Sequence, residues 1–226
     1  MVIAKPEVYP MRLWDFHNHQ SGKDCTLYNL AEPTLPISSP CSLGIHPWDL
    51  DVHWEDKLRL IQATSKSSDQ VLAIGEAGFD RIKGPDISLQ KAAFYAQARW
   101  ASTLGIPLIL HCVKGHDLLL EYLKSEKNPP AIIWHGWNQK PEMAKQLLSF
   151  PVYFSFGKHL LQEESNAVNW LKECPPDRVF FETDDSDLEI GSIYRAASLI
   201  LRLPVEEVAE LTLANWNRIS KRKINE

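Results

Sequence analysis

The sequence lacks a long apolar run and any closely paired cysteines. No stretch of about 18 apolar residues occurs, which argues against a membrane-spanning helix. Met1 to Pro6 contains no apolar stretch long enough for the core of a signal peptide. The four cysteines form no Cys-x-x-Cys pair, so we expect reduced and mostly buried thiols. These absences predict a soluble, cytoplasmic protein.

The chain also lacks an excess of positive charge. Its 24 Lys and Arg residues face 29 Asp and Glu residues, and the formal net charge is −5. This balance excludes a broad basic surface for duplex nucleic acid, although a small phosphate pocket is compatible with it. The 226 residues contain no internal repeat and suit one domain, which we expect to span residues 1–226. Nothing in the sequence predicts an oligomeric state.

Short apolar runs alternate with helix-like stretches, which is typical of β/α units around a parallel sheet. The predicted strands are Arg12–Phe16, Thr26–Leu30, Ser42–Ile45, Val71–Gly75, Pro107–Leu110, Ala131–Trp134, Val152–Phe156 and Val179–Phe181. The predicted helices are Trp54–Ala63, Ser88–Leu104, His116–Ser125, Pro141–Leu148, Ser165–Leu171, Ser192–Leu201 and Val205–Arg218. The pattern predicts an α/β protein.

The segment between residues 20 and 40 breaks this rhythm. Pro33, Pro36 and Pro40 interrupt it, and no amphipathic helix fits there. We interpret it as a short strand, Cys25–Leu30, followed by an extended connection. If eight strands exist, the helices after the first two are reduced or missing. Seven strands, or a barrel with one open flank, is the alternative.

A His-x-His motif stands where the first apolar run ends. His17 and His19 are two residues apart, so in an extended strand both side chains point to the same side, opposite Asn18. Two imidazoles on one side can bind one metal ion. An isolated motif of this kind can equally be a histidine pair on a solvent-facing strand.

Further residues of metal-ligand type follow other apolar runs: His46, Glu76, His111, His135 and Asp184. Each alone has an ordinary explanation, such as a core histidine, a helix-capping carboxylate or a turn residue. Their joint occurrence is harder to explain structurally, because a parallel barrel brings all its strand ends to one face. The pattern therefore predicts a metal site.

At this point the chain resembles the TatD-type metal-dependent hydrolases of the amidohydrolase-like barrel group. The matching segments are Asp15–His19, Gly44–Pro47, Ile74–Asp80, Gln90–Ala98, Pro107–His111, Trp134–Gly136, Tyr153–Gly157, Glu182–Asp184 and, near the end of the chain, Val208, Ala209, Thr212 and Asn215. They follow the family's order over nearly the whole chain. The resemblance implies a distorted TIM-type barrel with a two-metal site.

Carried over residue by residue, the resemblance implies the following ligands. His17, His19, Glu76 and Asp184 would hold the first ion. The second ion would be held by Glu76, His111 and His135, with Glu76 bridging the two. Asp184 is the expected general base and Glu76 the expected bridging catalytic carboxylate. These nitrogen and oxygen ligands admit Zn, Mn or Mg.

Departures from the family pattern concern the substrate. Trp48 replaces the usual histidine after Gly-x-His-Pro, and Val113 replaces an arginine, so Lys114 is the expected phosphate-binding cation. We assign His46 to substrate contact, although it could simply be hydrogen-bonded in a turn. Trp48 and Trp137 follow strand-end histidines and are candidates for stacking a base, with core packing as the alternative.

Three functions compete. The first is a divalent-metal-dependent phosphodiesterase, nuclease-like and acting at nucleic-acid ends, with Asp184 as general base. The second is hydrolysis of a carboxylic ester or amide, such as an aminoacyl group on RNA, since an activated water serves both electrophiles. The third is a metal-binding barrel with little catalysis whose uncovered surface binds a partner. The complete ligand set favours the first.

Overall fold

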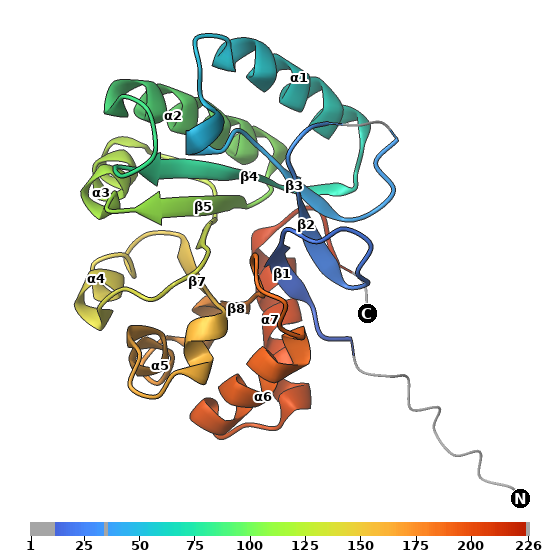
Figure 1. Ribbon diagram of the computed structural model, residues 1–226, viewed down its shortest axis with the longest axis vertical. Coiled ribbons are helices and arrows are strands. Elements are labelled where there is room, and N and C mark those ends of the chain that lie inside the picture. The colour runs from blue at the N-terminus through green and yellow to red at the C-terminus, as the bar shows by residue number, and fades with distance from the viewer. Residues whose placement is uncertain (1–11, 34–35, 225–226) are drawn as a thin grey trace, which may run out of the picture.

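Eight parallel strands form one sheet in the computed structural model, which describes residues 12–33 and 36–224. The sheet curls into a barrel in which each strand pairs with the next along the chain (Figure 1). The strands are β1 (Asp15–Asn18), β2 (Thr26–Leu30), β3 (Cys41–Leu43), β4 (Val71–Asp80), β5 (Leu108–Val113), β6 (Ile132–Trp134), β7 (Val152–Phe156) and β8 (Val179–Phe181). The expected α/β TIM-type barrel is confirmed, and the seven-stranded alternative is wrong. Met1 to Pro6 lie outside the described residues.

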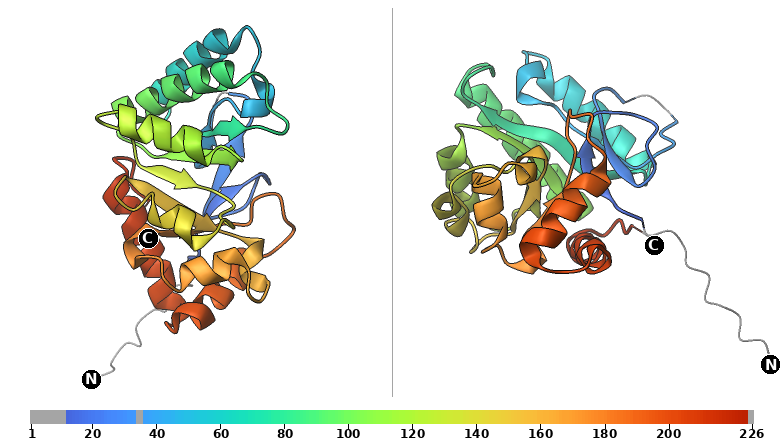
Figure 2. Two further views of the ribbon diagram at one scale, coloured as in Figure 1. Left: turned by 90° about the vertical axis from the view of Figure 1, so that its left-hand side faces the viewer. Right: turned by 60° about the horizontal axis from the view of Figure 1, so that its bottom comes forward.

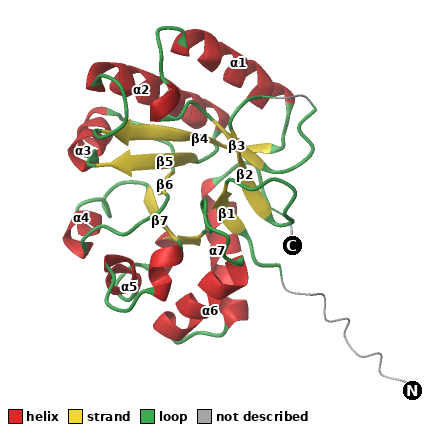
Figure 3. Ribbon diagram, in the orientation of Figure 1, coloured by secondary structure: helices red, strands yellow, loops and turns green. Residues whose placement is uncertain are grey.

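Helices follow β3 and the later strands: α1 (Trp54–Ser67), α2 (Ile87–Leu104), α3 (His116–Ser125), α4 (Pro141–Lys145), α5 (Asn166–Leu171), α6 (Ile190–Leu201) and α7 (Val205–Ile219). Short 3-10 turns are η1 (Pro47–Asp49), η2 (Lys158–Leu161) and η3 (Pro176–Arg178). Within residues 12–33 and 36–40, no helix follows β1 or β2, as expected. Figure 3 draws the described connections after these two strands as loops. We call β1, β2 and the loops after them the bare flank, and β4 to β8 with their helices the covered flank.

Local signals set the ends of α2. Asp86 caps its first turn by accepting a hydrogen bond from the backbone N–H of Ser88 at 2.8 Å. The helix begins at Ile87, one residue before the predicted Ser88. Gly105 ends the helix with φ +67°, a left-handed conformation that glycine adopts without steric cost.

The strands that carry the site run further than their apolar residues suggest. β4 continues past Gly75 to Asp80 because it stays paired with β5, from Ile74 opposite Leu108 to Asp80 opposite Val113. Gly78 permits this pairing: its φ is +155°, and a Cβ there would lie 1.9 Å from the carbonyl oxygen of His111. Glu76 and His111 therefore lie inside strands, not at strand ends as expected.

Aromatic packing closes the barrel between β1 and β8. One backbone bridge, Asn18 with Asp184, joins these strands. Below it, Trp216 of α7 stacks on Phe16 with ring centroids 5.6 Å apart and fills the interior. Figure 2 shows α7 lying along this side of the barrel. Side chains thus close the gap between β1 and β8, which we call the barrel seam. The ends of these two strands meet at the site.

The described helices include none that is both long and apolar enough to cross a membrane.

Candidate metal centre

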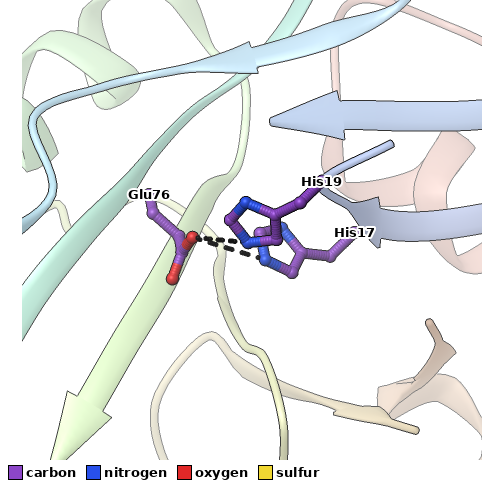
Figure 4. A group of neighbouring side chains, drawn as sticks. All are labelled: His17, His19 and Glu76. Atoms are coloured by element: carbon purple, nitrogen blue, oxygen red, sulfur yellow. Dashed lines mark ion pairs between the residues drawn. The ribbon is translucent and has the colours of Figure 1, made fainter. Parts of the chain in front are cut away.

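The first predicted ligand set lies together at one end of the barrel. His17 is fully buried in β1 and His19 follows the strand with its side chain 40% exposed. Their Nε2 atoms lie 3.4 and 3.3 Å from Oε2 of Glu76. Figure 4 draws both rings facing this carboxylate. Both imidazoles point to the same side, as their spacing predicts, so they can share one ion with the carboxylate.

Asp184 completes this set from the opposite edge of the seam. Its Oδ1 lies 3.6 Å from Nε2 of His17 and 3.4 Å from Nε2 of His19. The backbone N–H of Asp184 donates to the carbonyl oxygen of His17 at 3.0 Å, which fixes the loop after β8 against β1. The carboxylate is one-quarter exposed and therefore reachable from solvent.

The second set gathers around the other oxygen of the same glutamate. Nε2 of His135 lies 2.8 Å and Nδ1 of His111 3.2 Å from Oε1 of Glu76, and these two nitrogens are 3.4 Å apart. The two carboxylate oxygens of Glu76 thus face two different histidine pairs. This is the arrangement that a bridging carboxylate requires.

His46 lies beside the second set, with Nε2 3.6 Å from Oε1 of Glu76. Its distance alone would allow it to join a metal group with Glu76 and His111. Its Nδ1, however, accepts the backbone N–H of Trp48 at 3.1 Å, which places the ring proton on Nε2 when the imidazole is neutral. That proton favours a hydrogen bond to a substrate over metal ligation. Substrate contact therefore remains the prediction for His46.

Sequence reasoning missed the residues that hold Glu76. Asn29 on β2 donates through Nδ2 to Oε2 of Glu76 at 3.0 Å and accepts its backbone N–H through Oδ1 at 3.2 Å. The hydroxyl of Ser42 on β3 donates to the same Oδ1 at 3.3 Å. Only the packing of three strands brings these groups together, so no local pattern in the sequence could reveal them.

Asp80 was also missed, although it lies within the Gly-Glu-Ala-Gly-Phe-Asp motif. Its Oδ2 lies 3.3 Å from Nε2 of His111, on the side of that ring away from Glu76. Gln90 of α2 fixes the Asp80 backbone through two hydrogen bonds of 2.8 and 3.0 Å. Such a contact orients a ligating imidazole and sets its tautomer. In the same way, the side chain of Gln97 on α2 accepts a hydrogen bond from the backbone N–H of Ile45 and donates one to its carbonyl oxygen, just before His46.

The predicted substrate residues separate into two groups. Trp48 is half exposed at the rim of a cavity of about 160 Å³ that is also lined by His46 and Glu76, and Lys114 is exposed after β5. Trp137 is fully buried and packs edge-on against Trp134 and Phe154. Its predicted role in base stacking is therefore wrong. The chain turns after His135 and directs the indole into the core, which is the core packing predicted as the alternative.

Both site carboxylates are held in the ionised form. Burial raises the pKa of Glu76, but the charges of His135 and His17 and hydrogen bonds to the histidines outweigh it and keep that pKa well below its usual value. Burial likewise opposes ionisation of Asp184, yet the neighbouring imidazoles of His17 and His19 hold its pKa far below the usual range. The centre therefore carries two negative charges in a buried setting.

The histidines respond to those charges. Hydrogen bonds to Asp184 and Glu76 raise the pKa of His19 to about 9. Burial lowers the pKa of His46 to about 4, so its ring is neutral at physiological pH. Burial also opposes protonation of His135, but the carboxylates of Glu76 and Glu182 raise its pKa well above the usual value. Without metal, protons on imidazoles balance the carboxylates.

These residues fit divalent metal ions. Both ring nitrogens of His17 are buried and have no hydrogen-bond partner among the described residues. A buried polar atom without a partner is costly, and a metal ion would satisfy one of these nitrogens. Imidazole and carboxylate ligands suit Zn, Mn and related divalent ions, and ion binding would replace the imidazole protons.

Comparison with known proteins agrees with this geometry. Residues 25–221 match the model of the family described as TatD related DNase. The metal-dependent hydrolase YabD of Bacillus subtilis, itself described as uncharacterized, is 30% identical over 196 residues, 79% of this chain and 76% of that protein. A 3′-5′ ssDNA/RNA exonuclease TatD of Klebsiella pneumoniae is 30% identical over 146 residues, 62% of this chain and 55% of that protein.

Among solved structures, the barrel is similar to the TatD homologue YjjV of Escherichia coli, with a TM-score of 0.70 and 22% identity. The match covers 80% of this chain and 76% of that one. At this identity the likeness supports the fold alone, whereas the family match spans most of the chain. The protein therefore belongs to the TatD related DNase family and is a metal-dependent hydrolase.

Proposed function

We propose that the protein hydrolyses phosphodiester bonds near the ends of nucleic-acid strands with the help of two divalent ions, Zn, Mn or Mg. The observation that carries the proposal is the placement of Glu76 between two histidine pairs, with one carboxylate oxygen facing each pair. The nuclease name of the Klebsiella relative supports the choice of substrate. The net charge of −5 suits a pocket that takes a strand end rather than a surface that tracks a duplex.

His17, His19, Glu76 and Asp184 would hold one ion, and Glu76, His111 and His135 the other. When bound, such a pair activates a water and stabilises charge on the attacking and leaving oxygens of a displaced phosphate. Asp184, ionised and one-quarter exposed, accepts the proton of the attacking water. The Nε2–H group of His46 donates a hydrogen bond to a phosphate oxygen. Asn29 keeps the Glu76 carboxylate oriented throughout.

The test is cleavage of bis-p-nitrophenyl phosphate and of a labelled single-stranded oligonucleotide by wild type and Asp184→Asn, with Zn, Mn, Mg and Co. We expect metal-dependent cleavage of both substrates that falls by more than about a hundredfold in the variant. Asp185→Asn, at an exposed neighbour that pairs with Lys158, is the matched control and should cleave as wild type does. A wild type that binds metal but cleaves neither substrate contradicts the proposal.

Hydrolysis of a carboxylic ester or amide is the second candidate. The observation that favours it is Val113, which offers no cation to a phosphate where the family pattern has an arginine. Turnover of p-nitrophenyl acetate or an aminoacyl-RNA, with none of any phosphodiester, would select it. Metal binding without turnover of either class would favour a non-catalytic metal-binding barrel.

The four free cysteines support a cytoplasmic location, which we also propose.

A further inference from the structure

A tryptophan and a lysine meet at the rim of the metal centre. The indole Nε1–H of Trp48 donates to Oδ2 of Asp80 at 2.7 Å, which fixes the ring although half of it is exposed. The ring centroid lies 4.7 Å from that of His46 and 5.7 Å from that of His111. Trp48 is thus anchored to the same carboxylate that contacts a predicted metal ligand.

Lys83 lies over this indole. Its Nζ is 4.2 Å from the Trp48 ring centroid, a distance typical of a cation–π contact. The other oxygen of Asp80 accepts the backbone N–H groups of Ile82 and Lys83 at 2.7 and 2.9 Å. One carboxylate therefore holds both the turn that carries the lysine and the ring beneath it. The ammonium group is placed at the mouth of the centre by this arrangement.

The charge of Lys83 is available to a ligand. Its neighbour Arg81 is occupied by Asp117, which accepts hydrogen bonds of 3.0 and 2.7 Å from its two terminal nitrogens. Among the described residues, Lys83 has no acidic partner within 4.0 Å. An exposed ammonium held by an aromatic face keeps its hydrogen-bond donors free for an anion.

The contacts of Lys83 indicate which anion it meets. Its Nζ lies 4.2 Å from the ring centroid of Trp48, and that centroid lies 5.7 Å from the ring centroid of His111. Among the described residues, Lys83 forms no ion pair with the carboxylates of the centre, so it borders the centre without entering it. We propose that Lys83 and Trp48 form a subsite for the phosphate that adjoins the cleaved diester. The inference rests on the proposed phosphodiesterase function and defines its substrate class: strands or dinucleotides with at least two phosphates.

This subsite changes the roles of two predicted residues. Trp48 supports the cation, and a base stacked on the face of the indole that Lys83 covers would have to displace it. Lys114, predicted to bind phosphate, is exposed on the loop after β5, with its carbonyl oxygen accepting a hydrogen bond from Arg81 at 3.1 Å. Within the part of the chain that the structure describes, no hydrogen bond or ion pair holds its ammonium, whereas that of Lys83 lies over the Trp48 ring.

The test uses substrates that differ by one phosphate. The dinucleotide TpT contains one diester, and its 5′- and 3′-phosphorylated forms contain the same diester beside a second phosphate. For the metal-loaded wild type, we expect a higher kcat/KM with one of the phosphorylated forms than with TpT. In Lys83→Ala this preference should fall by about tenfold, the usual size of one charge-assisted contact at a partly exposed site. The preference of wild type should also weaken with added salt more than that of the variant.

Three further variants make the result specific. Trp48→Phe keeps an aromatic face but loses the bond to Asp80, and should retain more of the preference than Trp48→Leu. Lys66→Ala removes a similar lysine, 4.9 Å above Trp100 and remote from the centre, and should keep the wild-type preference. A preference that survives in Lys83→Ala, or is lost in Lys114→Ala instead, overturns the subsite. Failure of wild type to cleave TpT and bis-p-nitrophenyl phosphate alike contradicts the proposed function itself.

Discussion

The bare flank and the covered flank contribute to the same centre by different means. On the covered flank, α2 lies against β4 and fixes the backbones of Asp80 and Ile45 with two buried glutamines. On the bare flank, among the described residues, no helix follows either strand. Trp216 of α7 packs on Phe16 there, and polar side chains of the strands hold one another. Asn29 clamps Glu76, and Asp15 accepts the backbone N–H of Thr183 at 3.0 Å across the barrel seam.

This difference shows that a helix directly after the strand is not required to position the predicted ligands. His17 and His19 come from the bare flank, yet their distances to Glu76, 3.4 and 3.3 Å, match those of His111 from the covered flank, 3.2 Å. Hydrogen-bonded polar networks can help to fix geometry where no helix follows the strand, provided that their members are satisfied. Asp15 has such partners in Thr183 and Asn18.

The largest effect should come from Glu76, where the two flanks meet. Glu76→Gln keeps the shape but removes the charge that both histidine pairs share. We expect the affinity for both ions to fall by more than about a hundredfold, with loss of turnover, because a shared ligand is weakened at both sites. Calorimetric titration with Zn or Mn measures this. Glu121→Gln, at an exposed glutamate paired with Lys91, should bind as wild type does. Loss of only one ion would show that the flanks bind metal independently.

Substitution of two glycines by alanine tests whether the flanks differ in how well they tolerate an added Cβ. Gly78→Ala on β4 places a Cβ 1.9 Å from the carbonyl oxygen of His111 and should lower the free energy of unfolding by about 3 kcal/mol or more. Gly22→Ala on the bare flank also has positive φ, +81°, but no heavy atom within 4 Å. It should cost only about 1 kcal/mol of local strain. Urea denaturation followed by circular dichroism compares them, and equal costs would mean that the close approach of β5 is relieved elsewhere.

The next effect isolates the clamp of the bare flank. Asn29→Ala removes the donor to Oε2 of Glu76, the oxygen that faces His17 and His19. The ion on that side should bind about 10- to 100-fold more weakly, while the ion at His111 and His135 changes less. Ser42→Ala, one bond further away, should show a smaller loss in the same titration. If Asn29→Ala binds both ions as wild type does, the clamp has no role in metal binding.

How far the sequence could predict the molecule follows from which contacts are local. The spans of β7, β8 and α3 were predicted to the residue, because apolar runs and turn residues bound them directly. The length of β4 was missed, since Gly75 and Gly78 look like a strand end unless the pairing with β5 is known. Asn29 and Asp80 were missed because their partners are distant in sequence. Trp137 was misassigned because adjacency to His135 says nothing about the direction of its side chain.

A pH dependence should distinguish the metal-free from the metal-loaded centre. The pKa of His19 is raised to about 9 in the folded, metal-free protein, above its unfolded value of 6.5. Its contribution to stability is therefore complete below pH 6.5 and is lost as the pH rises through 9. Added metal must displace that proton, so the rise in Tm caused by metal should grow over the same range. His19→Gln should flatten the pH dependence of the metal-free Tm, and an unchanged profile would contradict the proton's role.

The smallest effect concerns thiol reactivity on the two flanks. Burial raises the pKa of Cys112 on β5 to about 12, and its side chain is 7% exposed, so little reactive thiolate forms at pH 8. Cys25, before β2, is only partly buried, although burial also raises its pKa. Iodoacetamide should therefore label Cys25 first, with peptide mass spectrometry reporting the order. Cys25→Ser is the control that should abolish the early label. Prior labelling of Cys112 would mean that the covered flank opens more readily than the bare one, and that its helices protect the strands less than their packing suggests.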